Sequence, residues 1–168
     1  MIEIEVGELA ASPGPAVLRP MAADWTAATG AARRLDLRAG EAITSQAEML
    51  GELPVGTAVL GPGGELPARF VIHVVVRSQE EAVSEAGVRR GLQNALLRAA
   101  EWGIDALAMP PLGTGAGNLD VDAAAEVILP VLVEHRRTHP HPARIVVIVE
   151  SPYEREAFER ELTRATRS

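Results

Sequence analysis

Apolar residues along the chain follow two patterns that predict strands and helices in alternation. Residues 70–76, 104–109 and 145–149 are apolar almost throughout, which is typical of buried strands. The segments that follow these runs carry apolar side chains at helical spacing, from 80 to 102, from 121 to 132 and from 151 to 162. This alternation predicts a largely parallel sheet with helices on both faces.

The first half of the chain adds strands at the sides of this sheet. Residues 2–6 alternate apolar and acidic side chains, which predicts a half-exposed edge strand. Residues 57–60 predict a strand that pairs antiparallel with the run at 70–76. We therefore expect an α/β fold with a mixed, mostly parallel central sheet. A length of 168 residues suits a single domain, which we assign to residues 1–168.

The segment between the predicted strands 2–6 and 57–60 has a weaker pattern. Residues 16–18 predict a short buried strand, which Arg19-Pro20 should close because a residue before proline is conformationally restricted. Residues 21–38 predict a loop that passes into a helix interrupted by Gly30. Residues 41–50 predict a second short helix that ends at a glycine.

A glycine-rich loop follows the predicted strand 104–109. Its sequence, from 110 to 122, is Pro-Pro-Leu-Gly-Thr-Gly-Ala-Gly-Asn-Leu-Asp-Val-Asp. Alternating glycines can turn several backbone N–H groups toward one anion, and ligands of parallel sheets bind beyond the carboxyl ends of the strands. The loop lacks the Gly-Lys-Ser/Thr ending of a P-loop and does not have the dinucleotide-binding spacing. A phosphate cradle and a plain strand-to-helix connection both fit this pattern.

Composition narrows the classes of partner. The net charge is −7, which argues against general nucleic-acid binding and against binding to anionic membranes. There is no cysteine for disulfides or thiolate metal sites, and no apolar run approaches the roughly 18 residues of a membrane span. The acidic, alternating N-terminus is unlike a signal peptide, so we expect a cytoplasmic protein. The sequence does not determine its oligomeric state.

Several motifs together resemble those of the macrodomain family. They are Gly7-Glu8-Leu9 after the first strand, Phe70-Val71-Ile72-His73, and the loop from Pro110 to Asn118, and the resemblance covers nearly the whole chain. It implies a three-layer α/β/α fold that binds ADP-ribose or a related small nucleotide, without a cofactor. Some macrodomains only bind. Others act on ADP-ribosylated proteins, on O-acetyl-ADP-ribose or on ADP-ribose 1″-phosphate.

The resemblance also implies roles for individual residues. Glu8 stands where the family has an aspartate that accepts a hydrogen bond from the adenine amino group, and Leu9 would place its backbone N–H near the adenine. Gly30 remains from a run of glycines. Tyr153 is the one aromatic residue near the segment that supplies a ring to stack on adenine. The diphosphate and part of the distal ribose would lie on the glycine loop, formed by Leu112, Gly113, Thr114, Gly115, Ala116, Gly117 and Asn118.

One departure from the family bears on catalysis. Active members carry Asn-Ala-Ala-Asn where this chain has Arg19-Pro20-Met21-Ala22. Ala22 cannot orient a distal ribose or a catalytic water, and we consider Asp24 and Thr29 as substitutes. The acids near the presumed cleft that could serve as a general base are Asp24, Asp120 and Asp122, and Asp24 is the candidate that we retain. Three functions follow: a binding module, a hydrolase of ADP-ribose esters or phosphoesters, and a scaffold that has lost its ligand and works through protein contacts.

The remaining candidates have structural interpretations. His73 lies in an apolar run, which favours a buried, hydrogen-bonded histidine over a catalytic one. His135, His139 and His141 follow a predicted helix end, where histidines are favourable in any case, so no metal site is predicted. Trp25 is either a core residue or a ligand contact.

Overall fold

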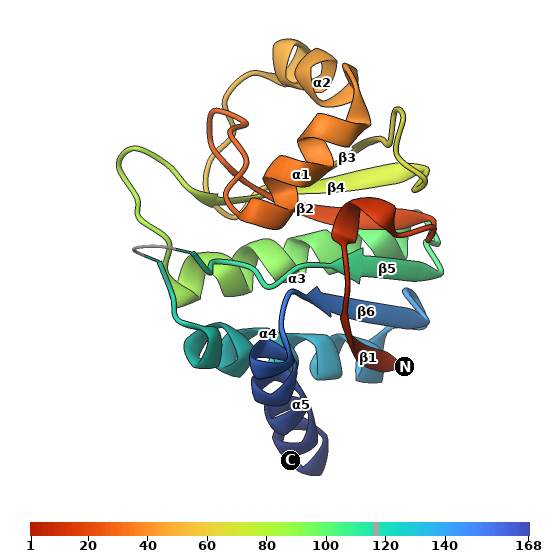
Figure 1. Cartoon of the computed structure of the whole chain (residues 1–168), viewed down its shortest axis with the longest axis vertical. Coiled ribbons are helices and arrows are strands. Elements are labelled where there is room, and N and C mark those ends of the chain that lie inside the picture. Colours follow the sequence, from red (N-terminus) through yellow and green to blue (C-terminus); the bar gives the residue numbers. More distant parts are fainter. Residues whose placement is uncertain (116–117) are drawn as a thin grey trace.

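The structure is a computed structural model that describes residues 1–115 and 118–168. In this part of the chain, the strands form one sheet in the order β1-β6-β5-β2-β4-β3 (Figure 1). The strands are β1 (Ile2–Val6), β2 (Ala16–Ala22), β3 (Ala58–Pro62), β4 (Phe70–Arg77), β5 (Ala106–Met109) and β6 (Arg144–Val149). The helices are η1 (Leu9–Ala11), α1 (Gly30–Ala39), α2 (Ala42–Leu50), α3 (Glu85–Glu101), α4 (Val121–Thr138) and α5 (Pro152–Arg167).

The sheet is mixed but mostly parallel, as the sequence predicts. β1, β6, β5, β2 and β4 pair in parallel, and only the ladder between β3 and β4 is antiparallel. β1 is an edge strand, which explains its alternation of apolar and acidic residues. The three-layer α/β/α fold implied by the resemblance is confirmed.

Two apolar cores lie on opposite faces of the sheet, because side chains alternate along each strand. In β4, Ile72 and Val74 join the core beneath α3 and α4, whereas Val71 and Val75 join the core beneath η1, α1 and α2. In β6, Val147 and Val149 face the α3–α4 side and Ile148 faces the α1 side. α5 packs on α4, and its Phe158 is fully buried in the α3–α4 core. Both faces of β4 and β6 are covered, so these strands are apolar almost throughout.

One predicted boundary is wrong. Arg19-Pro20 does not close the second strand, because β2 continues in register with β4 as far as Met21, and Ala22 pairs with Arg77 after a shift in register. The ladder with β5 ends at Val17, so β2 has no strand partner on that side beyond this point. The Pro20 carbonyl instead accepts the backbone N–H of Ala28 at 3.1 Å. Proline is tolerated where the strand needs no ladder N–H.

Local signals set the helix starts. Ser84, Asp120 and Ser151 cap α3, α4 and α5 by accepting a backbone N–H of the first turn. Gly30 does not interrupt a helix. It is the first residue of α1, and the hydroxyl of Thr29 accepts the Ala32 N–H at 3.1 Å. No helix in the described residues is long and apolar enough to cross a bilayer.

Candidate ligand-binding cleft

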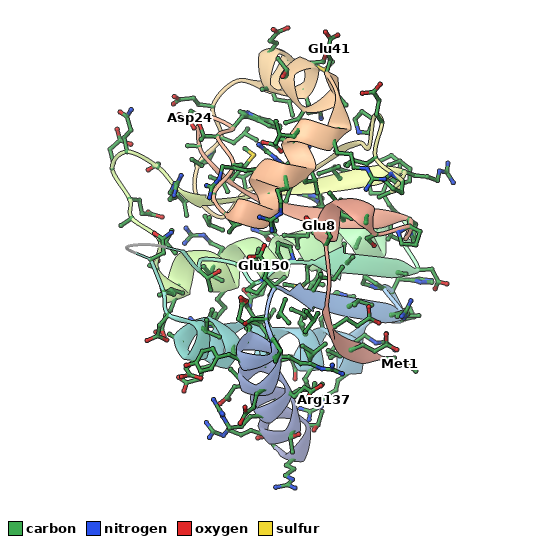
Figure 2. All side chains as sticks on the ribbon, viewed as in Figure 1. Met1, Glu8, Asp24, Glu41, Arg137 and Glu150 are labelled. Carbon is green, nitrogen blue, oxygen red and sulfur yellow. The ribbon has the colours of Figure 1, made fainter. Side chains whose placement is uncertain are left out.

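Five strand ends place the candidate residues at one edge of the sheet. β1, β6, β5, β2 and β4 run in parallel, so the segments that follow them begin at the same edge. These segments carry Glu8, Glu150, the glycine loop, Asp24 and the residues after Arg77. Figure 2 shows Glu8 at the start of η1 and Glu150 below it near the end of β6, with Asp24 on the side of the sheet nearer α2. Ligands of parallel sheets bind at such an edge.

The glycine loop closes on itself between β5 and α4. The Leu119 N–H donates to the Gly113 carbonyl at 2.9 Å, and the Asn118 N–H donates to the Gly115 carbonyl at 3.1 Å. The Asn118 side chain donates to the Thr114 carbonyl at 3.5 Å. Gly113 has a φ of 79°, and a Cβ there would lie 2.8 Å from Val88 Cγ2. Ala116 and Gly117, which we also predict to bind ligand, lie outside the described residues.

A cleft of about 240 Å³ lies between this loop and the start of α1. Thr114 and Gly115 form one wall, and Thr29, Gly30 and Ala31 form the opposite wall. The structure therefore brings together Gly30, Thr114 and Gly115, three of the residues assigned to the site from sequence. Further lining residues are Pro110, Pro111, Val121, Ile148, Glu150 and Glu154. Burial raises the pKa of Glu154 above its ordinary value.

Glu8 is held by an ion cluster at one end of this cleft. Both of its carboxylate oxygens accept from Arg34 Nε at 3.1 Å, and Arg34 Nη2 pairs with Glu150. The resemblance implies that Glu8 accepts a hydrogen bond from adenine, and in the structure its carboxylate accepts from Arg34. The three side chains come from the ends of β1 and β6 and from α1.

The other candidate residues differ in their exposure. Leu9 is buried in the core on the α1 side, and Leu112 is buried in the α3–α4 core. Their side chains are therefore packed inside the protein, and their backbone groups are the candidate ligand contacts. Tyr153 is 67% exposed in the first turn of α5 and does not line the cleft. Trp25 is buried, with its ring edge-on to His73 and its indole N–H donating to the Gly51 carbonyl at 2.7 Å.

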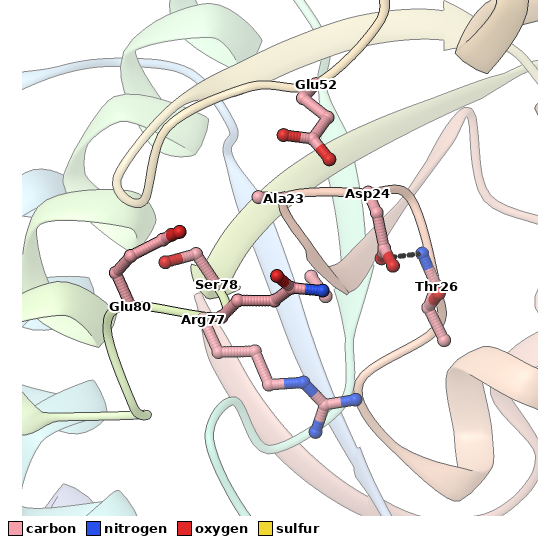
Figure 3. Close-up of a pocket in the computed structure, with 9 residues that line it drawn as sticks. Ala23, Asp24, Thr26, Glu52, Arg77, Ser78 and Glu80 are labelled. Atoms are coloured by element: carbon pink, nitrogen blue, oxygen red, sulfur yellow. Dashed lines mark hydrogen bonds between the residues drawn. The ribbon is translucent and has the colours of Figure 1, made fainter.

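Asp24 lies in a second cavity (Figure 3), which is also lined by Ala22, Glu52, Arg77 and Glu80. Its carboxylate accepts the Thr26 backbone N–H at 3.1 Å, and this hydrogen bond lowers the pKa of Asp24 below its ordinary value. Asp24 thus lies beside Ala22 but does not line the cleft with the glycine loop. A depressed pKa makes it a weaker general base.

The histidines have partners within the chain. His73 is 1% exposed, and its Nδ1 lies 3.4 Å from Arg19 Nη1, which confirms the buried, hydrogen-bonded histidine. His135 Nε2 lies 2.8 Å from the His141 carbonyl, and the rings of His135 and His139 are stacked. Among the described residues, no group of three or more potential ligands could hold a metal ion.

The sequence analysis missed Arg34, Glu150, Glu154 and Ile148. Glu150 directly follows a predicted buried strand, so the strand-end rule that located the glycine loop could have located it. Arg34 lies on the exposed side of a helix, and no spacing rule indicates that its guanidinium reaches two carboxylates from other elements.

Comparison with known proteins assigns the family. The Macro domain family profile matches residues 22–128. The chain belongs to the macro domain family. A relative from Aeropyrum pernix is 36% identical over 132 residues, which are 74% of this chain and 67% of that protein. An O-acetyl-ADP-ribose deacetylase from Enterobacter cloacae is 29% identical over 64% of this chain and 61% of its own length. Across the first relatives, the match spans between 58% and 67% of their length.

Solved macro domains share the fold. A mutant macrodomain from Oceanobacillus iheyensis with ADPR matches with a TM-score of 0.89 at 20% identity, over 99% of this chain and 94% of that chain. A Trypanosoma brucei macrodomain in complex with ADP-ribose matches with a TM-score of 0.85 at 17% identity, over 95% of this chain and 68% of that chain. At these identities the likeness establishes the fold of the macro domain.

Proposed function

We propose that this macro domain, acting as a single unit over residues 1–168, binds ADP-ribose or a related adenosine diphosphate ligand. The binding site is the cleft between the glycine loop and the start of α1. The observation that carries the proposal is the closed loop from Gly113 to Leu119 facing Gly30 at the carboxyl edge of the sheet. ADP-ribosylated proteins are the larger partners that this ligand implies, and the cytoplasm is the compartment that we propose.

The chemistry of the cleft suits a diphosphate. Backbone N–H groups of the glycine loop carry partial positive charge and require no side chain, so they tolerate divergence elsewhere. Gly30 and Ala31 form the first turn of α1, where backbone N–H groups have no partner within the helix. The hydroxyl of Thr29 accepts the Ala32 N–H and so caps this first turn. Both walls of the cleft therefore present donors to an anion.

Binding is better supported than hydrolysis. Ala22 stands at the position of the asparagine that orients water in active members, and it offers no polar group. Asp24 lines a different cavity from the glycine loop, and its lowered pKa weakens it as a base. A relative is named O-acetyl-ADP-ribose deacetylase, so hydrolysis of ADP-ribose esters is the second candidate. Turnover that disappears in Asp24→Ala would establish it.

Calorimetric titration with ADP-ribose, with AMP as the comparison, tests the binding proposal. We expect a low-micromolar dissociation constant for ADP-ribose, about −8 kcal/mol, and much weaker binding of AMP, which lacks the diphosphate. No heat with either ligand from folded protein would contradict the proposal and leave a scaffold that works through protein contacts.

A matched pair of glycine variants locates the site. Gly115 and Gly103 both have positive φ. A Cβ added at Gly115 would meet only Asn118 Nδ2, at 3.4 Å, and a Cβ added at Gly103 would meet nothing within 4 Å. Gly115 lines the cleft, whereas Gly103 precedes β5 at the opposite edge of the sheet. Gly115→Ala should weaken ADP-ribose binding at least about tenfold. Loss of two backbone hydrogen bonds to the diphosphate, at about 1 kcal/mol each, exceeds the roughly 1.4 kcal/mol that corresponds to a tenfold change in affinity. Gly103→Ala should bind as the wild type does.

A further inference from the structure

The ion cluster of Glu8, Arg34 and Glu150 is built from three separate elements. Glu8 follows β1, Glu150 follows β6, and Arg34 reaches both from the second turn of α1. β1 and β6 are paired through Val6 and Val149, so the two carboxylates leave the sheet side by side. Arg34 uses Nε toward Glu8 and Nη2 toward Glu150, which holds its guanidinium from two sides.

This guanidinium lies at the wall of the cleft. A Cβ on Gly30 would lie 3.4 Å from Arg34 Nη1, so the Nη1 side of the guanidinium lies against Gly30, the first residue of α1. Gly30 and Glu150 both line the cleft. Ile148 lines the cleft and also a neighbouring groove, which Glu8 borders. The ion cluster therefore stands where the cleft continues into the groove.

The cleft is small for a whole ligand, and its described lining contains no aromatic ring. Its volume of about 240 Å³ is below the roughly 300 Å³ at which pockets begin to enclose a drug-sized molecule. A nucleoside attached to a diphosphate in the cleft must therefore extend past its end. Tyr153 is exposed on α5 and Trp25 is buried against His73, so neither supplies a stacking surface in the cleft.

A guanidinium can take the place of an aromatic ring. It is flat, carries delocalised charge and stacks on the faces of aromatic rings, including nucleobases. Ion pairs to Glu8 and Glu150 engage its N–H edge and leave its two faces for other contacts. The Arg34 side chain is 44% exposed, so solvent still reaches it.

We propose that Arg34 is the base-binding residue of this macro domain: its guanidinium, held by Glu8 and Glu150, is the plane on which the purine of the ligand stacks. This inference rests on the proposed binding of an adenosine diphosphate ligand. It gives Glu8 a different role from direct hydrogen bonding to adenine, because Glu8 orients Arg34. A lysine at position 34 would keep the charge but lose the plane.

Calorimetry on Arg34→Lys separates stacking from charge. We expect Arg34→Lys to weaken ADP-ribose binding about tenfold, within the range for loss of one base stack. Inorganic pyrophosphate, which has no base, should bind Arg34→Lys as it binds the wild type. Glu150→Gln should weaken ADP-ribose binding by a smaller factor of about three, because Glu8 still holds the guanidinium.

Arg38→Lys is the matched control. Arg38 is exposed in the last turn of α1, and it forms no ion pair with the described residues. It should bind ADP-ribose as the wild type does. Unchanged or tighter ADP-ribose binding by Arg34→Lys would overturn the inference while the binding proposal stands, and so would an equal loss of pyrophosphate. Wild-type protein that binds no ADP-ribose would overturn both.

Discussion

Arg19 is the most completely buried charged side chain of the described residues, and it organises the segment beside the cleft. Its guanidinium donates to both carboxylate oxygens of Asp36 at 2.7 and 3.0 Å and to the Trp25 carbonyl at 2.6 Å. These bonds tie β2 to α1 and to the loop between them. Trp25 has a φ of 75°, and its carbonyl is held in that conformation by Arg19. A buried arginine thus fixes the segment where the resemblance expects an asparagine.

His73 must be neutral next to this arginine. Arg19 can only donate, so His73 Nδ1 accepts and the proton is on Nε2. Burial, followed by the charge of Arg19, lowers the pKa of His73 to about 3. The unfolded chain binds a proton near pH 6.5 and the folded chain does not, so this histidine costs stability as the pH falls from about 6.5 toward 3.

The pH dependence of unfolding checks this assignment. Between pH 6 and 4, the His73 contribution to the free energy of unfolding should fall by up to about 1.4 kcal/mol per pH unit. His73→Asn keeps an acceptor near Nδ1 but does not titrate, so urea unfolding of this variant should show a shallower loss over the same range. Equal slopes for the two proteins would mean that His73 is protonated in the fold.

Removing the partner of Arg19 should be costly. Asp36→Ala leaves a buried guanidinium without its carboxylate, and we expect a loss of about 3 kcal/mol in the free energy of unfolding. Leu37→Ala is the control on the same helix, because Leu37 is 87% exposed and should change stability by less than about 0.5 kcal/mol. Similar urea midpoints for the two variants would show that the Arg19 network is not important for stability.

Helices and strands were predictable where one physical signal was dominant. The strands β4, β5 and β6 follow from apolar runs, and the starts of α4 and α5 follow from the capping residues Asp120 and Ser151. β2 was cut short because the rule for residues before proline says nothing about which neighbours a strand has. Its length depends on a ladder with β4 that joins residues far apart in sequence.

The glycine loop makes a prediction about packing. At Gly113, the positive φ and the contact of a Cβ with Val88 Cγ2 at 2.8 Å both oppose a side chain. Gly113→Ala should therefore lower the free energy of unfolding by about 2 kcal/mol or more. Gly7→Ala is the control near the same edge, because its Cβ would meet only Ile148 Cγ2 at 3.7 Å. Equal thermal midpoints for the two variants would contradict the loop geometry.

The whole molecule brings together groups that the sequence keeps far apart. The position of the glycine loop could be predicted, since it follows one strand and needs only local pattern and the strand-end rule. The ion cluster could not, because it joins residues 8, 34 and 150, and it exists only once β1 and β6 are neighbours. The net charge of −7 likewise gives no indication that a positively charged side chain, that of Arg34, lies at the cleft. With Arg34 as the proposed base-binding residue, the ligand preference of this macro domain would depend on tertiary neighbours as well as on the glycine-loop motif.

A backbone amide NMR titration with ADP-ribose tests the location of binding most directly. We predict the largest shift changes at Thr114, Gly115, Gly30 and Ala31, which form the two walls of the cleft. Residues 24 and 77, in the second cavity, should change little. Changes confined to that second cavity, or none at saturating ADP-ribose, would contradict the account of this cleft as the ligand-binding site.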